Sequence, residues 1–306
     1  MIRSAAPEKI AGFNSLRDGA LLPAVGFIIG FILSYTMQPQ TARADKVKKF
    51  QAPSKKGASG DGGRPTFTAN GYTSTYLVYA DGLDRTKSVG MLIYADGSGE
   101  YGLKHPTDPY LLGGDGGLVA VAKKHNMVLL TPLSPNKNCD DHEGSCWYMG
   151  NPPGYARWAE SLVTQVQSQY PIDKKRIAFG GYSSGAQLAT EWWVPSGAAQ
   201  RTMEDGVIVA ISYGGSPKMT EVAYTPSFIA SVHMNWNVGS KDPSYDKDRE
   251  FSVKVGYDHY TKAGFKTSLD IVRGLGHERD GTFGGVMDAQ IIKHVPPATA
   301  IVAAPE

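Results

Sequence analysis

The chain has 306 residues, of which 41% are hydrophobic and 20% are charged, and its formal net charge is +2. These proportions are typical of a globular protein with a buried core. The length suits one large domain or two small ones. The nearly balanced charge argues against nucleic acid as a partner, because nucleic-acid-binding proteins carry an excess of Lys and Arg.

The first 44 residues have the layout of a secretory signal peptide. Arg3, Lys9 and Arg17 precede an uncharged run over residues 19–41, and Ala42-Arg43-Ala44 then forms an A-x-A cleavage pattern. An uncleaved membrane anchor is the alternative, because the apolar run approaches the roughly 20 residues that span a bilayer. Under both interpretations the protein is exported, so we expect it to be secreted or held at the cell surface, with membrane or envelope association through this segment.

Three further regions follow the N-terminal segment. Residues 45–65 are rich in Lys, Gly and Ser without an apolar period, which predicts a flexible basic linker. Residues 66–296 contain no repeat or break in composition, so we expect one folded domain there and a short tail over 297–306.

Strand-length apolar runs alternate with segments of helical period along the predicted domain. Strands are predicted over 76–80, 89–95, 127–133, 176–179, 207–212, 232–238 and 269–272. Helices are predicted over 119–125, 155–170, 184–193, 247–263 and 284–294. This alternation predicts an α/β fold with a mostly parallel central sheet and helices on both faces.

The stretch Gly181-Tyr182-Ser183-Ser184-Gly185 lies between a predicted strand and a predicted helix. It fits G-x-S-x-G, the pattern of a nucleophile elbow, in which a tight turn holds one serine in a strained conformation. The two glycines are needed because a Cβ there would collide with the neighbouring strand and helix. The register selects Ser183 as the nucleophile. Ser184 supplies the first amide after it, at a helix N-terminus where partial positive charge can meet an oxyanion.

A serine nucleophile needs a histidine base and an orienting carboxylate, which follow in the chain order Ser, acid, His. Of the histidines after Ser183, only His277 lies in a loop at the carboxyl end of a predicted strand, so we predict that it is the base. Asp242 follows the strand 232–238 and is the favoured acid. Asp246 and Asp248 on the same loop are rivals, whereas Asp270 lies too early in its strand.

A second oxyanion donor is expected from the loop after the strand 89–95, which reads Asp96-Gly97-Ser98-Gly99. Glycines there allow a backbone N–H to face the pocket. The amides of Gly97 and Ser98 are both candidates, and the sequence does not choose between them.

Cys139 and Cys146 are the only cysteines, and they flank an acidic, glycine-containing loop. In an exported protein we expect a disulfide between them, which would stabilise the fold by roughly 2.5 kcal/mol. Asp140, Asp141, His142 and Glu143 in this loop match no trusted ligand pattern, so we predict no metal site. Aromatic residues near this loop and the elbow are candidates for substrate binding: Trp147, Tyr148, Tyr182, Trp192 and Trp193.

The elbow, Asp242 and His277, in this order and spacing, resemble the α/β-hydrolase superfamily over about residues 66–296. The DGSG loop, the Cys-flanked acidic loop and the exported layout further resemble secreted esterases of the polyhydroxybutyrate depolymerase and feruloyl esterase-like group. Relatives commonly carry His-Gly at the oxyanion loop, where this chain has Asp96-Gly97. The resemblance implies an α/β-hydrolase fold and hydrolysis of a small or polymeric carboxylic ester, without a metal or organic cofactor.

Three alternatives to ester hydrolysis remain open from the sequence. An acyltransferase would use the same residues to acylate a cell-envelope acceptor. A non-catalytic hydrolase-fold protein would bind a ligand, and a serine peptidase would share the same motifs. The sequence leaves the substrate and the oligomeric state open, since a fold does not fix a substrate.

Overall fold

The computed structural model describes residues 64–139, 144–245, 251–279 and 281–301. The predicted signal peptide or anchor and almost all of the predicted linker lie outside these residues, as do the rival acids Asp246 and Asp248. In the described part of the chain, no helix is long and apolar enough to cross a membrane.

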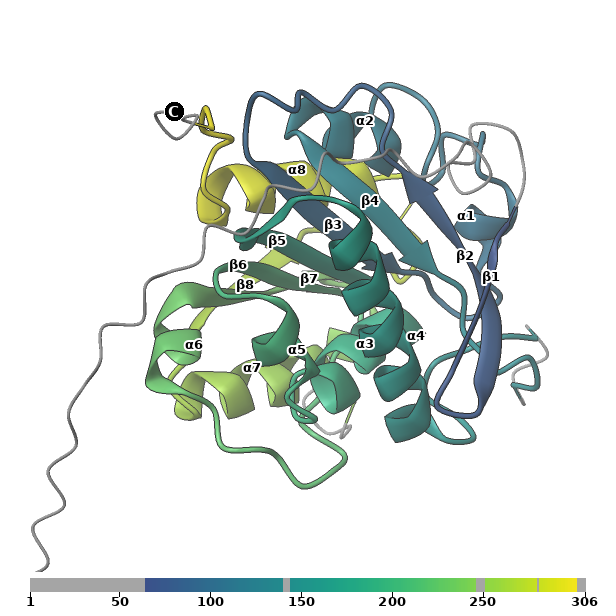
Figure 1. Cartoon of the computed structure of the whole chain (residues 1–306). Coiled ribbons are helices and arrows are strands. Elements are labelled where there is room, and N and C mark those ends of the chain that lie inside the picture. The colour runs from purple at the N-terminus through teal and green to yellow at the C-terminus, as the bar shows by residue number, and fades with distance from the viewer. Residues whose placement is uncertain (1–63, 140–143, 246–250, 280, 302–306) are drawn as a thin grey trace, which may run out of the picture. The chain divides into compact units, whose positions relative to one another are not determined.

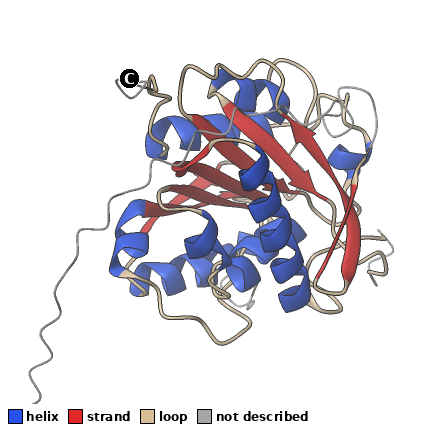
Figure 2. Cartoon of the chain, in the orientation of Figure 1, coloured by secondary structure: helices blue, strands red, loops and turns tan. Residues whose placement is uncertain are grey.

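The described chain forms one eight-stranded sheet with helices on both faces (Figure 2). Its strand order is β1-β2-β4-β3-β5-β6-β7-β8. The first two pairings, β1 with β2 and β2 with β4, are antiparallel, and all later pairings are parallel. The strands are β1 (Thr66–Ala69), β2 (Tyr72–Tyr79), β3 (Val89–Ala95), β4 (Met127–Pro132), β5 (Ile172–Tyr182), β6 (Gly206–Ile211), β7 (Val232–Gly239) and β8 (Lys266–Val272).

Two helical layers cover the sheet, and each buries its own apolar cluster against one face (Figure 1). One layer contains α1 (Tyr101–Lys104), α2 (Leu118–Lys124) and α8 (Phe283–His294). The other contains α3 (Pro152–Gln169), α4 (Ser184–Gln187), the π-helix Leu188–Trp193, α5 (Ala198–Thr202), α6 (Pro226–Ser231) and α7 (Val253–Lys262). The central strands β3, β4 and β6 are buried along their whole length, as both faces are covered.

The helix α3 shows how local sequence directs this packing. Asn151 caps its N-terminus by accepting a hydrogen bond from the Gly154 amide, and prolines occupy its first positions. Trp158, Leu162, Val163 and Val166 are all buried, which confirms the face predicted from their spacing. The Trp158 indole also donates to the carbonyl of Phe67 in β1, so α3 holds the edge strand against the core.

The predicted elements are confirmed in type where the structure describes them, although the helix predicted over 247–263 begins only at Val253. Several short elements were missed. The missed elements are β1, α1, α5 and α6, each of four to six residues, which is too short to show a period. The predicted helix 184–193 is one α-turn followed by a π-helix. The predicted tail begins too early: the Ser88 amide donates to the Thr299 carbonyl and the Ile301 amide to the Thr86 carbonyl, so the folded part reaches residue 301.

Candidate active site

Ser183 stands on a sharp turn between β5 and α4, at the carboxyl end of the sheet. Its φ of 50° and ψ of −114° place it in a strained backbone region. A Cβ at Gly181 would lie 2.3 Å from the Gly185 carbonyl oxygen, and one at Gly185 would lie 2.0 Å from that of Ala95. Both flanking glycines are therefore required by the close approach of backbone to backbone, as the motif predicts.

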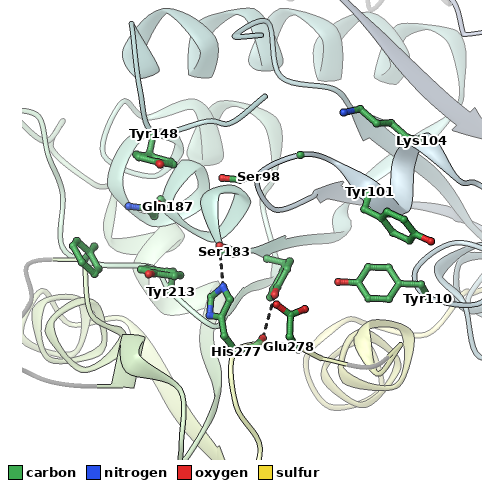
Figure 3. A pocket seen from close by; sticks show the side chains of 13 residues that line it. Ser98, Tyr101, Lys104, Tyr110, Tyr148, Ser183, Gln187, Tyr213, His277 and Glu278 are labelled. Carbon is green, nitrogen blue, oxygen red and sulfur yellow. Dashed lines mark hydrogen bonds between the residues drawn. The ribbon is translucent and has the colours of Figure 1, made fainter. Parts of the chain in front are cut away.

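His277 and Asp242 reach Ser183 from the loops after β8 and β7. The two loops pack closely, since the Lys241 amide donates to the Leu275 carbonyl at 2.9 Å and a Cβ at Gly239 would collide with it. His277 Nε2 lies 3.2 Å from Ser183 Oγ (Figure 3). On the other side of the ring, His277 Nδ1 lies 3.1 and 3.2 Å from the two Asp242 carboxylate oxygens. The structure thus brings together Ser183, His277 and Asp242 in one hydrogen-bonded chain.

Asp242 is only 4% exposed, and its side chain is fully buried. Burial by itself raises the pKa of Asp242, but the hydrogen bonds from His277 and from the Ser244 amide outweigh it and hold the pKa at about 2. Asp242 is therefore ionised at neutral pH, so it accepts the Nδ1 proton of His277. That tautomer leaves Nε2 free to accept the hydroxyl proton of Ser183.

Asp270 and the other histidines that follow Ser183 are engaged elsewhere, whereas Asp246 and Asp248 lie outside the described residues. Asp270 accepts hydrogen bonds from Asn235 and Gln290. His233 bonds to Ser268 and its ring stacks on His294 at 3.6 Å. His259 pairs with Glu221. The sequence-based rejection of these groups as acid or base agrees with where they lie.

The two predicted oxyanion donors on the β3 loop differ in their partners. The Gly97 amide donates to the Asp96 carboxylate at 2.9 Å, so it is already occupied. Ser98 lines the pocket beside Ser183 (Figure 3). Of the two amides, that of Ser98 is therefore the one without a partner among the described residues. Ser184 begins α4 directly after Ser183, where a first-turn amide has no partner within the helix.

Asp96 itself is a buried acid and is only 2% exposed. Burial raises the pKa of Asp96 to about 7, although hydrogen bonds from backbone amides, that of Gly97 foremost, oppose the shift. Its Oδ2 accepts the Gly102 amide at 3.0 Å. The sequence marked this residue as a departure from the family pattern but did not indicate these contacts.

A pocket of about 930 Å³ opens over Ser183 and His277. Figure 3 shows its two sides: Tyr148, Gln187 and Tyr213 lie on one side of Ser183, and Tyr101, Tyr110 and Lys104 on the other. The remaining lining residues are Ser98, Gly99, Tyr182, Phe251 and Glu278.

The predicted aromatic lining is only partly correct. Tyr182 lines the pocket, and its hydroxyl donates to the His277 carbonyl at 3.1 Å, which steadies the histidine loop. Trp147 is fully buried in the core, and Trp192 packs against that core and does not line the pocket. Trp193 is also buried, with its ring 5.3 Å from that of Phe179. Aromatic type and nearness in sequence do not distinguish a pocket wall from a core position.

Cys139 and Cys146 form the predicted disulfide, with Cα atoms 6.0 Å apart. The loop that it closes contacts the loop after β3, because the Gly99 amide donates to the Ser145 carbonyl at 2.8 Å. Residues 140–143 of the acidic loop lie outside the described residues.

The strand order, the serine turn after β5, and the acid and histidine after β7 and β8 define the α/β-hydrolase fold. No protein-family model and no curated protein matches the sequence. Solved structures do resemble the chain. A phospholipase/carboxylesterase from Dyadobacter fermentans is 18% identical over 72% of this chain and 97% of its own, with a TM-score of 0.46.

Two further solved structures resemble the chain at a similar level. A thermostable esterase is 14% identical over 76% of this chain and 63% of its own, with a TM-score of 0.49. SOBER1 from Arabidopsis thaliana is 14% identical over 67% of this chain and 99% of its own, with a TM-score of 0.46. At these values the likenesses carry no argument about the chemistry of this chain, which rests on its own geometry.

Proposed function

We propose that the protein is an exported serine hydrolase that cleaves carboxylic esters through an acyl-enzyme intermediate. The observation that carries the proposal is the hydrogen-bonded chain from Ser183 Oγ through His277 to the buried Asp242 carboxylate. Each of these residues comes from a different loop at one edge of the sheet. An assembly of nucleophile, base and orienting acid activates a serine hydroxyl for attack on an acyl carbon.

The first half of the reaction forms the acyl-enzyme. Ser183 attacks the ester carbonyl while His277 Nε2 takes its proton, and Asp242 stabilises the imidazolium through Nδ1. The amides of Ser184 and Ser98 hold the oxyanion of the tetrahedral intermediate. His277 then protonates the leaving alcohol, and the acyl group remains on Ser183.

The second half releases the acid. A water molecule gives a proton to His277 Nε2 and attacks the acyl carbon, and the collapse of the second tetrahedral intermediate restores the Ser183 hydroxyl. The proposed chemistry uses no metal or organic cofactor. The open pocket, with its tyrosines and Phe251, is compatible with either a small ester or a segment of a polymer.

Export is part of the proposal and rests on two features. The N-terminal segment has the basic, apolar and A-x-A regions of a signal peptide. The Cys139–Cys146 disulfide supports an oxidising compartment, where such bonds persist. Separating intact from processed protein in a cell-fractionation experiment distinguishes cleavage after Ala44 from retention as an anchor.

Labelling with a fluorophosphonate tests the nucleophile. The purified protein should be labelled, Ser183→Ala should not be, and Ser184→Ala should still react because it keeps the Ser183 hydroxyl. The protein is then assayed with p-nitrophenyl esters of increasing chain length, polyester particles and peptides. Absence of labelling in the wild type would support a binding protein instead, and labelling with transfer to an added alcohol but little hydrolysis would support the acyltransferase.

A further inference from the structure

The buried carboxylate of Asp96 organises the turn after β3 by accepting backbone amides from both of its ends. Asp96 Oδ1 accepts the Gly97 amide at 2.9 Å and Oδ2 accepts the Gly102 amide at 3.0 Å. Since Asp96 does not line the pocket and is almost fully buried, these bonds are its main contribution.

These hydrogen bonds decide which amide of the turn is available to a substrate. Gly97 lies directly against the serine turn, since a Cβ there would be 3.3 Å from Ser183 Cβ and 2.8 Å from the Tyr182 ring. Its N–H, however, is directed to Asp96. Ser98 is the next residue and lines the pocket, and its N–H donates to no other described residue.

We infer that Asp96 is a positioning residue: by holding the amides of Gly97 and Gly102, it presents the Ser98 amide to the developing oxyanion on the substrate bound at Ser183. This inference rests on the proposed ester hydrolysis. Asp96 acts through Ser98 and touches neither the substrate nor the reacting atoms.

The geometry makes the role specific to a carboxylate. In Asp96→Asn one terminal atom still accepts an amide, but the other becomes an NH2 donor that faces either the Gly97 amide or the Gly102 amide. Neither side-chain flip can satisfy both sides, because backbone donors lie on each of them. One buried backbone N–H is then left without an acceptor. Because an unpaired buried N–H is costly, we expect the backbone of the turn to shift.

Glu100 offers a matched control on the same turn. It is also fully buried, but its carboxylate binds the Ser134 amide, the Ser145 hydroxyl and, at 3.4 Å, the ammonium of Lys137 rather than amides of the turn. In Glu100→Gln the amide oxygen can accept from Ser134, and the Ser145 hydroxyl can reverse its role and accept from the NH2. Lys137, whose side chain is half-exposed, can turn to solvent when the oxygen that it contacts becomes an NH2 group. This variant therefore removes a buried charge of the same loop without leaving a buried backbone amide unpaired.

The test compares wild type, Asp96→Asn and Glu100→Gln in ester hydrolysis and in binding of a trifluoromethyl ketone, which adds Ser183 to form a tetrahedral oxyanion. Removing a whole oxyanion donor lowers kcat by roughly 10²–10³. If the Ser98 amide is displaced in Asp96→Asn, kcat should fall by roughly 10–100-fold while KM stays within about twofold of wild type. The affinity for the trifluoromethyl ketone should fall by a similar factor. Glu100→Gln should stay within about threefold of wild type in kcat.

A second measurement uses the wild type alone and does not depend on the folding of a variant. In 15N-labelled protein, binding of the trifluoromethyl ketone should shift the amide proton of Ser98 downfield while leaving that of Gly97 nearly unchanged. A shift at Gly97 instead of Ser98, wild-type kcat in Asp96→Asn, or equal losses in both variants would overturn the inference. If the wild type neither hydrolyses esters nor reacts with fluorophosphonate, the proposed function fails first, and the role of Ser98 fails with it.

Discussion

Replacing Asp242 with asparagine should disable the site while leaving its pocket in place. The Asp242 carboxylate accepts the Nδ1 proton of His277, whereas an asparagine of the same shape presents an NH2 group there in one of its two orientations. The Ser244 amide donates to Oδ1 at 2.8 Å and favours that orientation, because it keeps the amide oxygen in place. His277 then carries its proton on Nε2 and cannot accept one from Ser183. We expect kcat to fall by roughly 10⁴ with little change in KM.

The same substitution should also lower stability by an amount that follows from the pKa of Asp242. The folded-state pKa of about 2 lies below the ordinary value of 3.8. A lowered pKa adds stability above the unfolded-state value, and this stability is lost as pH falls through the folded-state value. The difference corresponds to about 2 kcal/mol at neutral pH, which Asp242→Asn should forfeit.

Steady-state hydrolysis of p-nitrophenyl acetate at neutral pH measures the loss of kcat. Urea unfolding at pH values on both sides of the Asp242 titration measures the loss of stability. Asp270→Asn is the matched control, since Asp270 also lies toward the end of a neighbouring strand but bonds to Asn235 and Gln290. It should keep kcat within about threefold. A kcat in Asp242→Asn within tenfold of wild type, or an equal loss in Asp270→Asn, would refute the assignment of Asp242 as the orienting acid.

Three further predictions concern the elements around the site. Gly185→Ala places a Cβ 2.0 Å from the Ala95 carbonyl oxygen and should prevent stable folding, whereas Gly285→Ala, with open space around it in α8, should raise the unfolding free energy by roughly 0.5–1 kcal/mol. Circular dichroism melts compare the pair, and a stable, active Gly185→Ala protein would contradict the elbow geometry. Replacing both Cys139 and Cys146 with serine should lower the unfolding free energy by roughly 2.5 kcal/mol, and a urea midpoint equal to that of wild type would show that the disulfide adds nothing. Because burial raises the pKa of Asp96 to about 7 from 3.8, wild type should lose up to about 4 kcal/mol relative to Asp96→Asn as pH rises from about 4 to above 7. A stability difference between these two proteins that does not vary with pH would contradict the shifted titration of Asp96.

The order and type of the main elements were determined by the sequence itself. Parallel strands buried on both faces require continuous apolar runs, and runs such as residues 89–95 and 207–212 stand out against the helical periods between them. The serine turn could also be predicted from local sequence. The flanking glycines of G-x-S-x-G are required because a Cβ at either would collide with backbone a few residues away or in the adjacent strand. Asp242 and His277 could be chosen from the sequence as the candidate acid and base, because both follow predicted strands and the carboxyl ends of parallel strands meet at one edge of a sheet.

Only the tertiary structure decided which aromatic rings line the pocket and which amides of the β3 loop have partners. Trp147 and Tyr148 are neighbours in sequence, yet the first is in the core and the second lines the pocket, because the orientation of each ring depends on packing from distant elements. Likewise, Gly97 and Ser98 carry equivalent amides until the fold buries Asp96 beside one of them. Local sequence specifies which groups are present and which strand end bears them. Long-range burial and hydrogen bonding then determine which of those groups remain available for chemistry.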